Sequence, residues 1–164
     1  MILVTVGASH FRFDRLLHAV DGLSTSEAVV VQHGPSPVRP AGARCIEFLP
    51  FDAVAELVGR ARVVVTHAGV GSILLSLMHD KRPVVVPRLR SFGETVDDHQ
   101  LESARRFARA GLVTLVEDPR GLPLAIADGG GAASPAAGED LSLVDDLRAY
   151  LESAVGRPGV PLPR

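Results

Sequence analysis

Three short segments carry residue types that could bind a ligand, and each follows a short run of valine, isoleucine or leucine. The first is Gly7-Ala8-Ser9-His10, where a glycine allows a backbone turn to approach a ligand closely. An ordinary turn between a strand and a helix explains this segment equally well. The other two segments are longer and carry more polar groups.

The second segment is rich in glycine and reads Thr66-His67-Ala68-Gly69-Val70-Gly71-Ser72. It leads into an apolar helical pattern for which Ser72 is the expected N-cap, and the free amides at a helix start favour an anion. Two pyrophosphate-binding patterns do not fit, because the segment lacks the Lys-Ser/Thr of a P-loop and Leu74 stands where a dinucleotide-binding loop has its third glycine. A structural turn, with His67 as a satisfied loop residue, remains the alternative.

The third segment runs from Arg88 to Gln100 and collects basic, acidic, imidazole and amide groups. The Glu94 carboxylate suits a ribose diol, and the pair His99-Gln100 suits sugar hydroxyls, because these groups donate or accept hydrogen bonds in defined directions. Asp97 and Gln100 also have the spacing of a helix capping box, which needs no ligand. The alternative is therefore a solvated loop.

Short apolar strands alternate with amphipathic helical stretches along the first 120 residues. The expected strands are residues 2–6, 29–31, 45–49, 62–65, 83–87 and 112–116. Near-continuous apolar strands of this kind are typical of a parallel sheet that helices cover on both faces. The sequence thus predicts an α/β fold, a Rossmann-like doubly wound parallel sheet of about six strands in a single domain. Ligands bind at the carboxyl ends of such strands, where the three polar segments lie.

The chain after this domain has a different composition. We expect the domain to span residues 1–120, followed by a flexible linker rich in Gly, Ala, Ser and Pro over residues 121–139. Apolar spacing predicts an amphipathic helix over residues 140–155, and three prolines mark residues 156–164 as a loose tail.

Composition excludes several classes of protein. The 164 residues suit one domain, and 46% hydrophobic against 22% charged residues with a net charge of −2 describe a globular chain with no bulk charge for nucleic acid. The single cysteine, Cys45, excludes an internal disulfide and a multi-cysteine zinc site, and fits a reducing compartment. No apolar run approaches the ~20 residues that cross a bilayer. We expect a cytoplasmic protein that meets a membrane only through a partner.

Four motifs in this order resemble the C-terminal, nucleotide-sugar-binding domain of family 28 glycosyltransferases, which have the GT-B fold. The motifs are Val4-Thr5-Val6-Gly7 with Phe13-Asp14-Arg15-Leu16, the segment from Thr66 to Ser72, Pro83-Val84-Val85-Val86-Pro87-Arg88, and Phe92-Gly93-Glu94 with Asp98-His99-Gln100. The chain is similar to the small donor-binding subunit of bacterial two-component capsule or exopolysaccharide glycosyltransferases. It is likewise similar to the soluble half of the eukaryotic two-subunit enzyme that adds the second N-acetylglucosamine to the dolichol-linked precursor. The resemblance covers residues 1–118.

The resemblance implies roles for particular residues. The donor diphosphate would be held by His67, Gly69, Gly71 and Ser72, and the sugar hydroxyls would meet His99 and Gln100. Many relatives carry a ribose-binding glutamate at the position of Ser76, so Glu94 becomes the candidate for that contact. Arg88 and Arg90 would pair with a sugar carboxylate or a phosphate, or face solvent. The candidate substrate-binding residues are Gly7, His67, Gly69, Gly71, Ser72, Arg88, Glu94, His99 and Gln100.

The resemblance also implies a function. The expected activity is transfer of a hexosyl group from a UDP-sugar to a lipid-linked acceptor in polysaccharide biosynthesis, with no cofactor and no metal, since the chain lacks the Asp-x-Asp of metal-dependent glycosyltransferases. A membrane-anchored partner subunit would supply the acceptor site and the general base, for which His10 is the local candidate. The alternative is a non-catalytic activator that stabilises a separate transferase. A nicotinamide-dependent or redox protein is disfavoured by the missing third glycine and the lack of paired cysteines.

Overall fold

Six parallel strands form a single sheet in the order β3-β2-β1-β4-β5-β6. The structure is a computed structural model that describes residues 1–129. The strands are β1 (Ile2–Thr5), β2 (Val29–Gln32), β3 (Arg44–Ile46), β4 (Val63–Thr66), β5 (Val84–Val85) and β6 (Thr114–Leu115). The chain builds outward from β1 to β3 on one side and from β4 to β6 on the other, which is the doubly wound arrangement that the sequence predicts.

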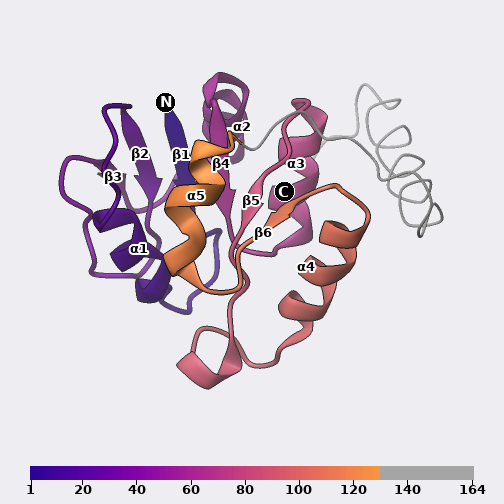
Figure 1. Cartoon of the computed structure of the whole chain (residues 1–164). Helices are drawn as coiled ribbons and strands as arrows, with labels where there is room; N and C mark the ends of the chain where they lie inside the picture. Colours follow the sequence, from indigo (N-terminus) through magenta and orange to yellow (C-terminus); the bar gives the residue numbers. More distant parts are fainter. Residues whose placement is uncertain (130–164) are drawn as a thin grey trace, which may run out of the picture.

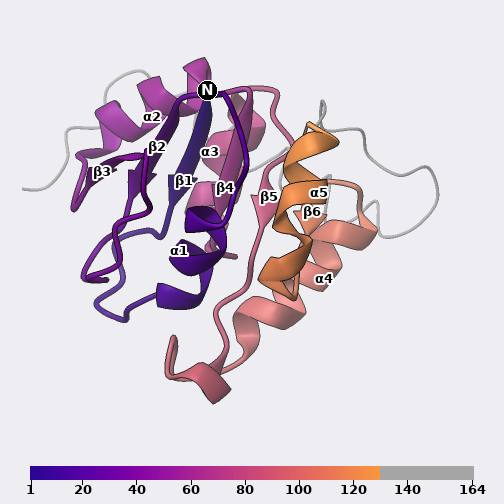
Figure 2. The ribbon, with the colours of Figure 1, turned by 60° about the vertical axis from the view of Figure 1, so that its left-hand side comes forward.

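Helices cover both faces of this sheet. They are α1 (Asp14–Asp21), α2 (Phe51–Arg60), α3 (Val70–Met78), α4 (His99–Arg109) and α5 (Leu122–Ala127), with the short 3-10 helices η1 (Arg90–Phe92) and η2 (Pro119–Gly121). Figure 1 shows α1 and α5 together on the near side of the sheet, and Figure 2 shows α2 and α3 behind it. The connection that carries η1 projects at the bottom of Figure 1.

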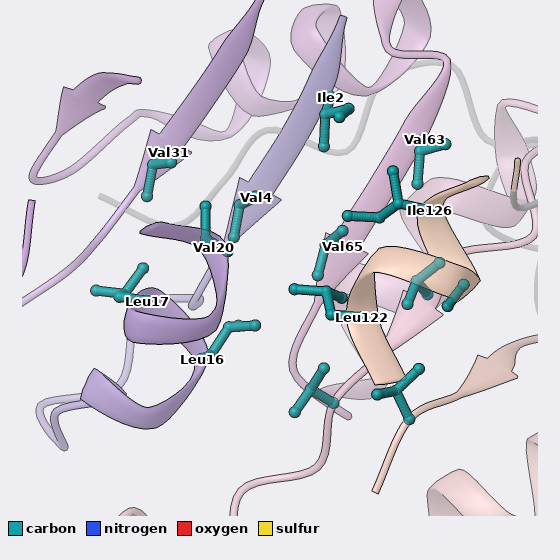
Figure 3. Close-up of a cluster of buried hydrophobic side chains, with 14 of the residues drawn as sticks. Ile2, Val4, Leu16, Leu17, Val20, Val31, Val63, Val65, Leu122 and Ile126 are labelled. Atoms are coloured by element: carbon teal, nitrogen blue, oxygen red, sulfur yellow. The ribbon is translucent and has the colours of Figure 1, made fainter. Parts of the chain in front are cut away.

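The main core lies between the sheet and the pair α1 and α5 (Figure 3). Alternate residues of the central strand β1 point to opposite faces, so Ile2 and Val4 join this core whereas Leu3 joins Val58 of α2 on the other side. The expected helical stripe Leu16, Leu17 and Val20 is buried in α1, as the spacing predicts. Burial on both faces explains why the central strands are continuously apolar.

Two strands, β3 and β5, are shorter than the sequence predicts. β3 ends at Ile46 instead of residue 49, and β5 is confined to Val84–Val85 between its flanking prolines. Proline has no N–H to donate to a ladder, which limits β5, although Val86 N still donates to Thr66 O at 2.9 Å. The early end of β3 releases residues 47–49 into a loop at the carboxyl edge of the sheet.

The first part of the segment predicted as a flexible linker is helical instead. Leu122–Ala127 form α5, and Leu122, Ala125 and Ile126 pack in the main core, so the domain continues beyond residue 120. The rest of the expected linker, the helix over residues 140–155 and the tail over 156–164 lie outside the described residues. Within residues 1–129, no helix is both long enough and apolar enough to cross a membrane.

Candidate functional site

A cavity of about 310 Å³ opens at the carboxyl ends of β1, β2 and β4. Three connections build it: the turn after β1, the loop between β3 and α2, and the start of α3. Its lining residues are Thr5, Gly7, Ala8, Gln32, Phe48, Leu49, Phe51, Val54, Gly71, Ser72 and Leu75. We call this cavity the main cleft, and it lies where ligands bind in open parallel sheets.

Two aromatic rings form the outer wall of the main cleft. Phe48 is 67% exposed and Phe51 is 70% exposed, so both rings present their surfaces to solvent at the mouth of the cavity. Exposed rings beside an apolar cavity are suited to stacking on a flat heterocycle. The sequence did not identify them, because residues 45–49 resemble a weak strand in which Phe48 would be an ordinary sheet residue.

The start of α3 forms the inner wall. The helix begins at Val70 with Gly69 as N-cap, so the expectation that Ser72 caps it is wrong; Ser72 instead lies in the first turn and faces the cleft. The first intrahelical bonds run from Ser72 N and Ile73 N to Gly69 O, both 3.1 Å, and the amides of Val70 and Gly71 precede them. A Cβ added at Gly71 would meet no atom within 4 Å, so the helix start is open to a ligand.

A single amide side chain fixes the turn after β1. Gly7 has a φ of +75°, a conformation that favours glycine. Its carbonyl accepts a hydrogen bond from Gln32 Nε2 at 3.2 Å, and the same Nε2 donates to Glu47 O at 3.1 Å. Thr5 Oγ1 donates to Gln32 Oε1 at 2.7 Å. Buried Gln32, which the sequence did not single out, thus links the glycine turn to the loop that carries Phe48.

The imidazole of His67 fits between two glycines next to the main cleft. A Cβ added at Gly7 would lie 2.4 Å from His67 Cε1, and one added at Gly69 would lie 2.2 Å from His67 Nε2. Both glycines are therefore needed for the ring to occupy this place. Burial lowers the pKa of His67 from 6.5 to about 4, and the nearby charge of Arg88 adds to the effect. The imidazole is neutral at pH 7 and carries one N–H.

A second cavity of about 180 Å³ lies on the other side of the glycine turn. It shares Gly7, Gln32 and Phe48 with the main cleft and adds polar groups from Ser9, His10 and Glu47. The ring of His10 packs against Phe11 with centroids 4.2 Å apart. The structure thus brings His10 to the edge of the site, separate from His67.

Two expected ligand contacts, Arg88 and Glu94, are buried instead. Glu94 is 4% exposed and its carboxylate accepts from Arg15 Nε at 3.0 Å, from Arg15 Nη2 at 2.8 Å and from Leu89 N at 3.0 Å. Arg88 is 1% exposed and donates to backbone carbonyls. Neither residue lines the main cleft. Both side chains are thus engaged within the protein, and the ribose contact expected of Glu94 and the ligand contact expected of Arg88 stay predictions.

His99 and Gln100 begin α4, and they do not line the main cleft. The His99 side chain is 82% exposed. The N-cap is Asp98 with no side-chain capping bond, so the expected capping box of Asp97 and Gln100 is wrong; Asp97 Oδ1 instead accepts from His99 N at 3.1 Å. Gln100 Oε1 lies 3.5 Å from Arg88 N. His99 is thus open to solvent, whereas Gln100 contacts the connection after β5.

The sheet order and the site at its carboxyl edge define a Rossmann-like domain of the kind that forms the C-terminal half of GT-B glycosyltransferases. The model of the glycosyltransferase family 28 C-terminal domain matches residues 1–129, and the chain belongs to this family. The family match includes α5, in agreement with the packed helix.

One curated protein and two solved structures are similar to this chain. A UDP-N-acetylglucosamine--N-acetylmuramyl-(pentapeptide) pyrophosphoryl-undecaprenol N-acetylglucosamine transferase from Opitutus terrae is 35% identical over 98 residues, which are 58% of this chain and 23% of that protein. Among solved structures, the calicheamicin glycosyltransferase CalG4 has a TM-score of 0.59 at 17% identity, covering 94% of this chain and 38% of its own. Acinetobacter baumannii MurG has a TM-score of 0.52 at 20% identity, covering 77% of this chain and 40% of its own. The chain thus spans less than half the length of these relatives.

Proposed function

We propose that this chain is the donor-binding part of a glycosyltransferase that transfers a hexosyl group from a UDP-sugar to a lipid-linked acceptor. The observation that carries the proposal is the main cleft. An aromatic wall, a glycine turn and an open helix start enclose this cavity of about 310 Å³. The cavity lies within the range of small-molecule sites, which begins at about 300 Å³. Family membership supports sugar transfer as the chemistry.

The parts of a nucleoside diphosphate match the parts of the cleft. The rings of Phe48 and Phe51 suit the base, and the amides of Val70 and Gly71 with the Ser72 hydroxyl suit the diphosphate. The anomeric carbon would then lie beyond the start of α3, toward the start of α4, where His99 and Gln100 lie. This arrangement assigns the sugar to the polar side of the site and the base to its apolar side.

Transfer breaks the bond between the anomeric carbon and the diphosphate oxygen and forms a bond to the acceptor oxygen, whose proton passes to a base. Negative charge develops on the leaving diphosphate, where fixed N–H groups stabilise it. Neutral His67 has one N–H for this purpose. Its Nδ1 lies 3.4 Å from Thr66 Oγ1, so the Thr66 hydroxyl can donate to Nδ1 and leave Nε2 of His67 as the donor. We assign the general base to a partner, with His10 as the candidate on this chain.

The acceptor site belongs to a second component in this proposal. A curated relative is named for an undecaprenol-linked substrate, which supports a lipid-linked acceptor. A membrane-anchored subunit that binds a lipid-linked acceptor, as in capsule or exopolysaccharide synthesis, would complete the site and recruit this chain to the inner face of the membrane. Mixing the chain with such a subunit is expected to give activity that neither has alone. Full transferase activity from this chain alone would contradict the proposal that a partner subunit is required.

Donor binding is tested by calorimetric titration with UDP and a panel of UDP-sugars. Saturable UDP binding is expected, and Ser72→Ala should weaken it at least about tenfold through loss of one hydrogen bond to a charged group. Ser26→Ala is the matched control, because Ser26 is an exposed serine in the turn before β2. A chain that binds no UDP-sugar would instead be a non-catalytic activator of a separate transferase, and the proposal would fail.

A further inference from the structure

The guanidinium of Arg88 lies buried between the two connections that follow β1 and β5. Nη2 donates to Val6 O at 2.8 Å, and Nη1 donates to Phe11 O, Arg12 O and Glu94 O, all at 3.1 Å. One side chain thus holds the end of the first strand, the segment before α1 and the segment before α4. The bonds to Val6 O and Glu94 O are buried, and those to Phe11 O and Arg12 O are partly buried.

The ring of Phe13 packs against the face of the Arg88 guanidinium. The guanidinium carbon of Arg88 lies 4.6 Å from the Phe13 ring centroid, and Phe13 is fully buried. A cation over an aromatic face is attracted by the ring quadrupole, most strongly away from water. Arg88 is therefore fixed both in the plane of its N–H groups and perpendicular to it.

A second arginine joins the same two connections. Arg15 of α1 pairs with Glu94 and donates through Nη2 to Pro87 O at 2.8 Å. Glu94 in turn accepts from Leu89 N, so its carboxylate fixes the connection before α4 from within. The connection over residues 87–94 is thus held twice, by the fork of Arg88 to the segment 6–12 and by the Arg15–Glu94 ion pair to α1.

Arg88 retains its charge in this environment. Burial lowers its pKa to about 10, and the Glu94 carboxylate opposes that effect, so the guanidinium is protonated at neutral pH. A neutral side chain of similar length would leave four carbonyl oxygens without their donor. Because those carbonyls belong to two different connections, the loss would loosen both at once.

We propose that Arg88 is a positioning residue that makes the connections after β1 and β5 a single unit and thereby fixes the Gly7 turn of the main cleft. The identity of the ligand in that cleft rests on the proposed function. The coupling of the two connections does not depend on it. Arg88 acts through the backbone of Val6, which directly precedes Gly7, and has no direct contact with the donor.

Hydrogen exchange measured by mass spectrometry tests the coupling. Arg88→Met is expected to accelerate amide exchange at least about tenfold in both segments 7–13 and 89–94, and to leave β2, α2 and the rest of the sheet unchanged. Arg62→Met is the matched control, because Arg62 also donates to a backbone carbonyl, Ile126 O, but lies at the other edge of the sheet. It should leave both segments as they are in the unmodified protein.

The affinity for UDP separates positioning from a general effect on stability. Arg88→Met should weaken UDP binding about tenfold at a temperature where the variant is fully folded, and Arg62→Met should not. If Arg88→Met does not fold, Arg88→Lys serves, because lysine keeps the charge but lacks the planar fork and should loosen the same two segments. A lower unfolding midpoint with unchanged exchange in segment 7–13 would overturn the proposal. Absence of UDP binding in the unmodified protein would contradict the proposed function, while the exchange pattern would still decide the coupling.

Discussion

Replacing Gly69 by alanine measures how closely the His67 ring fits between its two glycines. The added Cβ would lie 2.2 Å from Nε2, 2.9 Å from Cε1 and 3.0 Å from Cδ2 of the ring. Gly69 has φ −75° and ψ 127°, which any residue adopts, so the substitution adds no backbone strain. The main cost is the displacement of a half-buried imidazole, and overpacking of this kind costs about 1–3 kcal/mol. Gly69 is also the N-cap of α3, where alanine is less favourable than glycine by up to about 1 kcal/mol.

Gly71→Ala is the control for this substitution. Gly71 lies two residues further along, in the first turn of α3, and an added Cβ would meet nothing within 4 Å. Alanine is favoured over glycine in a helix by up to about 1 kcal/mol, so this variant should be as stable as the unmodified protein or slightly more stable. The pair of variants separates the effect of the His67 ring from the effect of adding a methyl group to this loop.

Urea unfolding of the single and double variants completes the test. In the His67→Ala background the ring is gone, and Gly69→Ala should then cost only the N-cap difference of up to about 1 kcal/mol. The rest of its cost is the interaction energy between the two positions. An equal cost of Gly69→Ala with and without the ring, or no cost in either, would refute the fit of His67 between the glycines.

Two further predictions concern the charge of His67 and the aromatic wall. Because the pKa of His67 is about 4 in the folded protein, the unfolded chain binds this proton more strongly, and the free energy of unfolding should fall by about 2 kcal/mol between pH 7 and pH 5. Urea unfolding of His67→Gln should show a much smaller fall, and an equal fall would assign the effect to other groups. Phe48→Ala should weaken UDP binding about tenfold in calorimetry through loss of stacking, whereas Phe92→Ala, similarly exposed but outside the main cleft, should not; equal effects of the two would argue against the aromatic wall.

The central sheet could be predicted because its strands carry their own signal. Val63, Val64 and Val65 are apolar in succession, and only burial on both faces explains such a run. Helix α5 could not be predicted in this way. It has six residues with a proline at its start, and it exists because Leu122 and Ile126 pack against the sheet. Intrinsic propensity is too weak to specify so short a helix without its tertiary contacts.

The site was only partly predictable for a related reason. Gly7, Gly71 and Ser72 follow strands and could be found from their position at the carboxyl edge. Phe48 was missed because β3 ends early: Gly34 N donates to Glu47 O beyond the last ladder pair, and the chain then leaves the sheet. The burial of Glu94 depends on Arg15, 79 residues away in the sequence, which no local pattern indicates.

Amide chemical shifts of the labelled chain during a titration with UDP test the central claim most directly. The account predicts saturable shifts at Gly7, Phe48 and Gly71, the residues that three separate connections contribute to the main cleft. Amides at the opposite edge of the sheet, such as that of Arg62, should not move. Failure of UDP to produce saturable shifts, or shifts that gather at the edge near Arg62, would contradict a donor site in the main cleft.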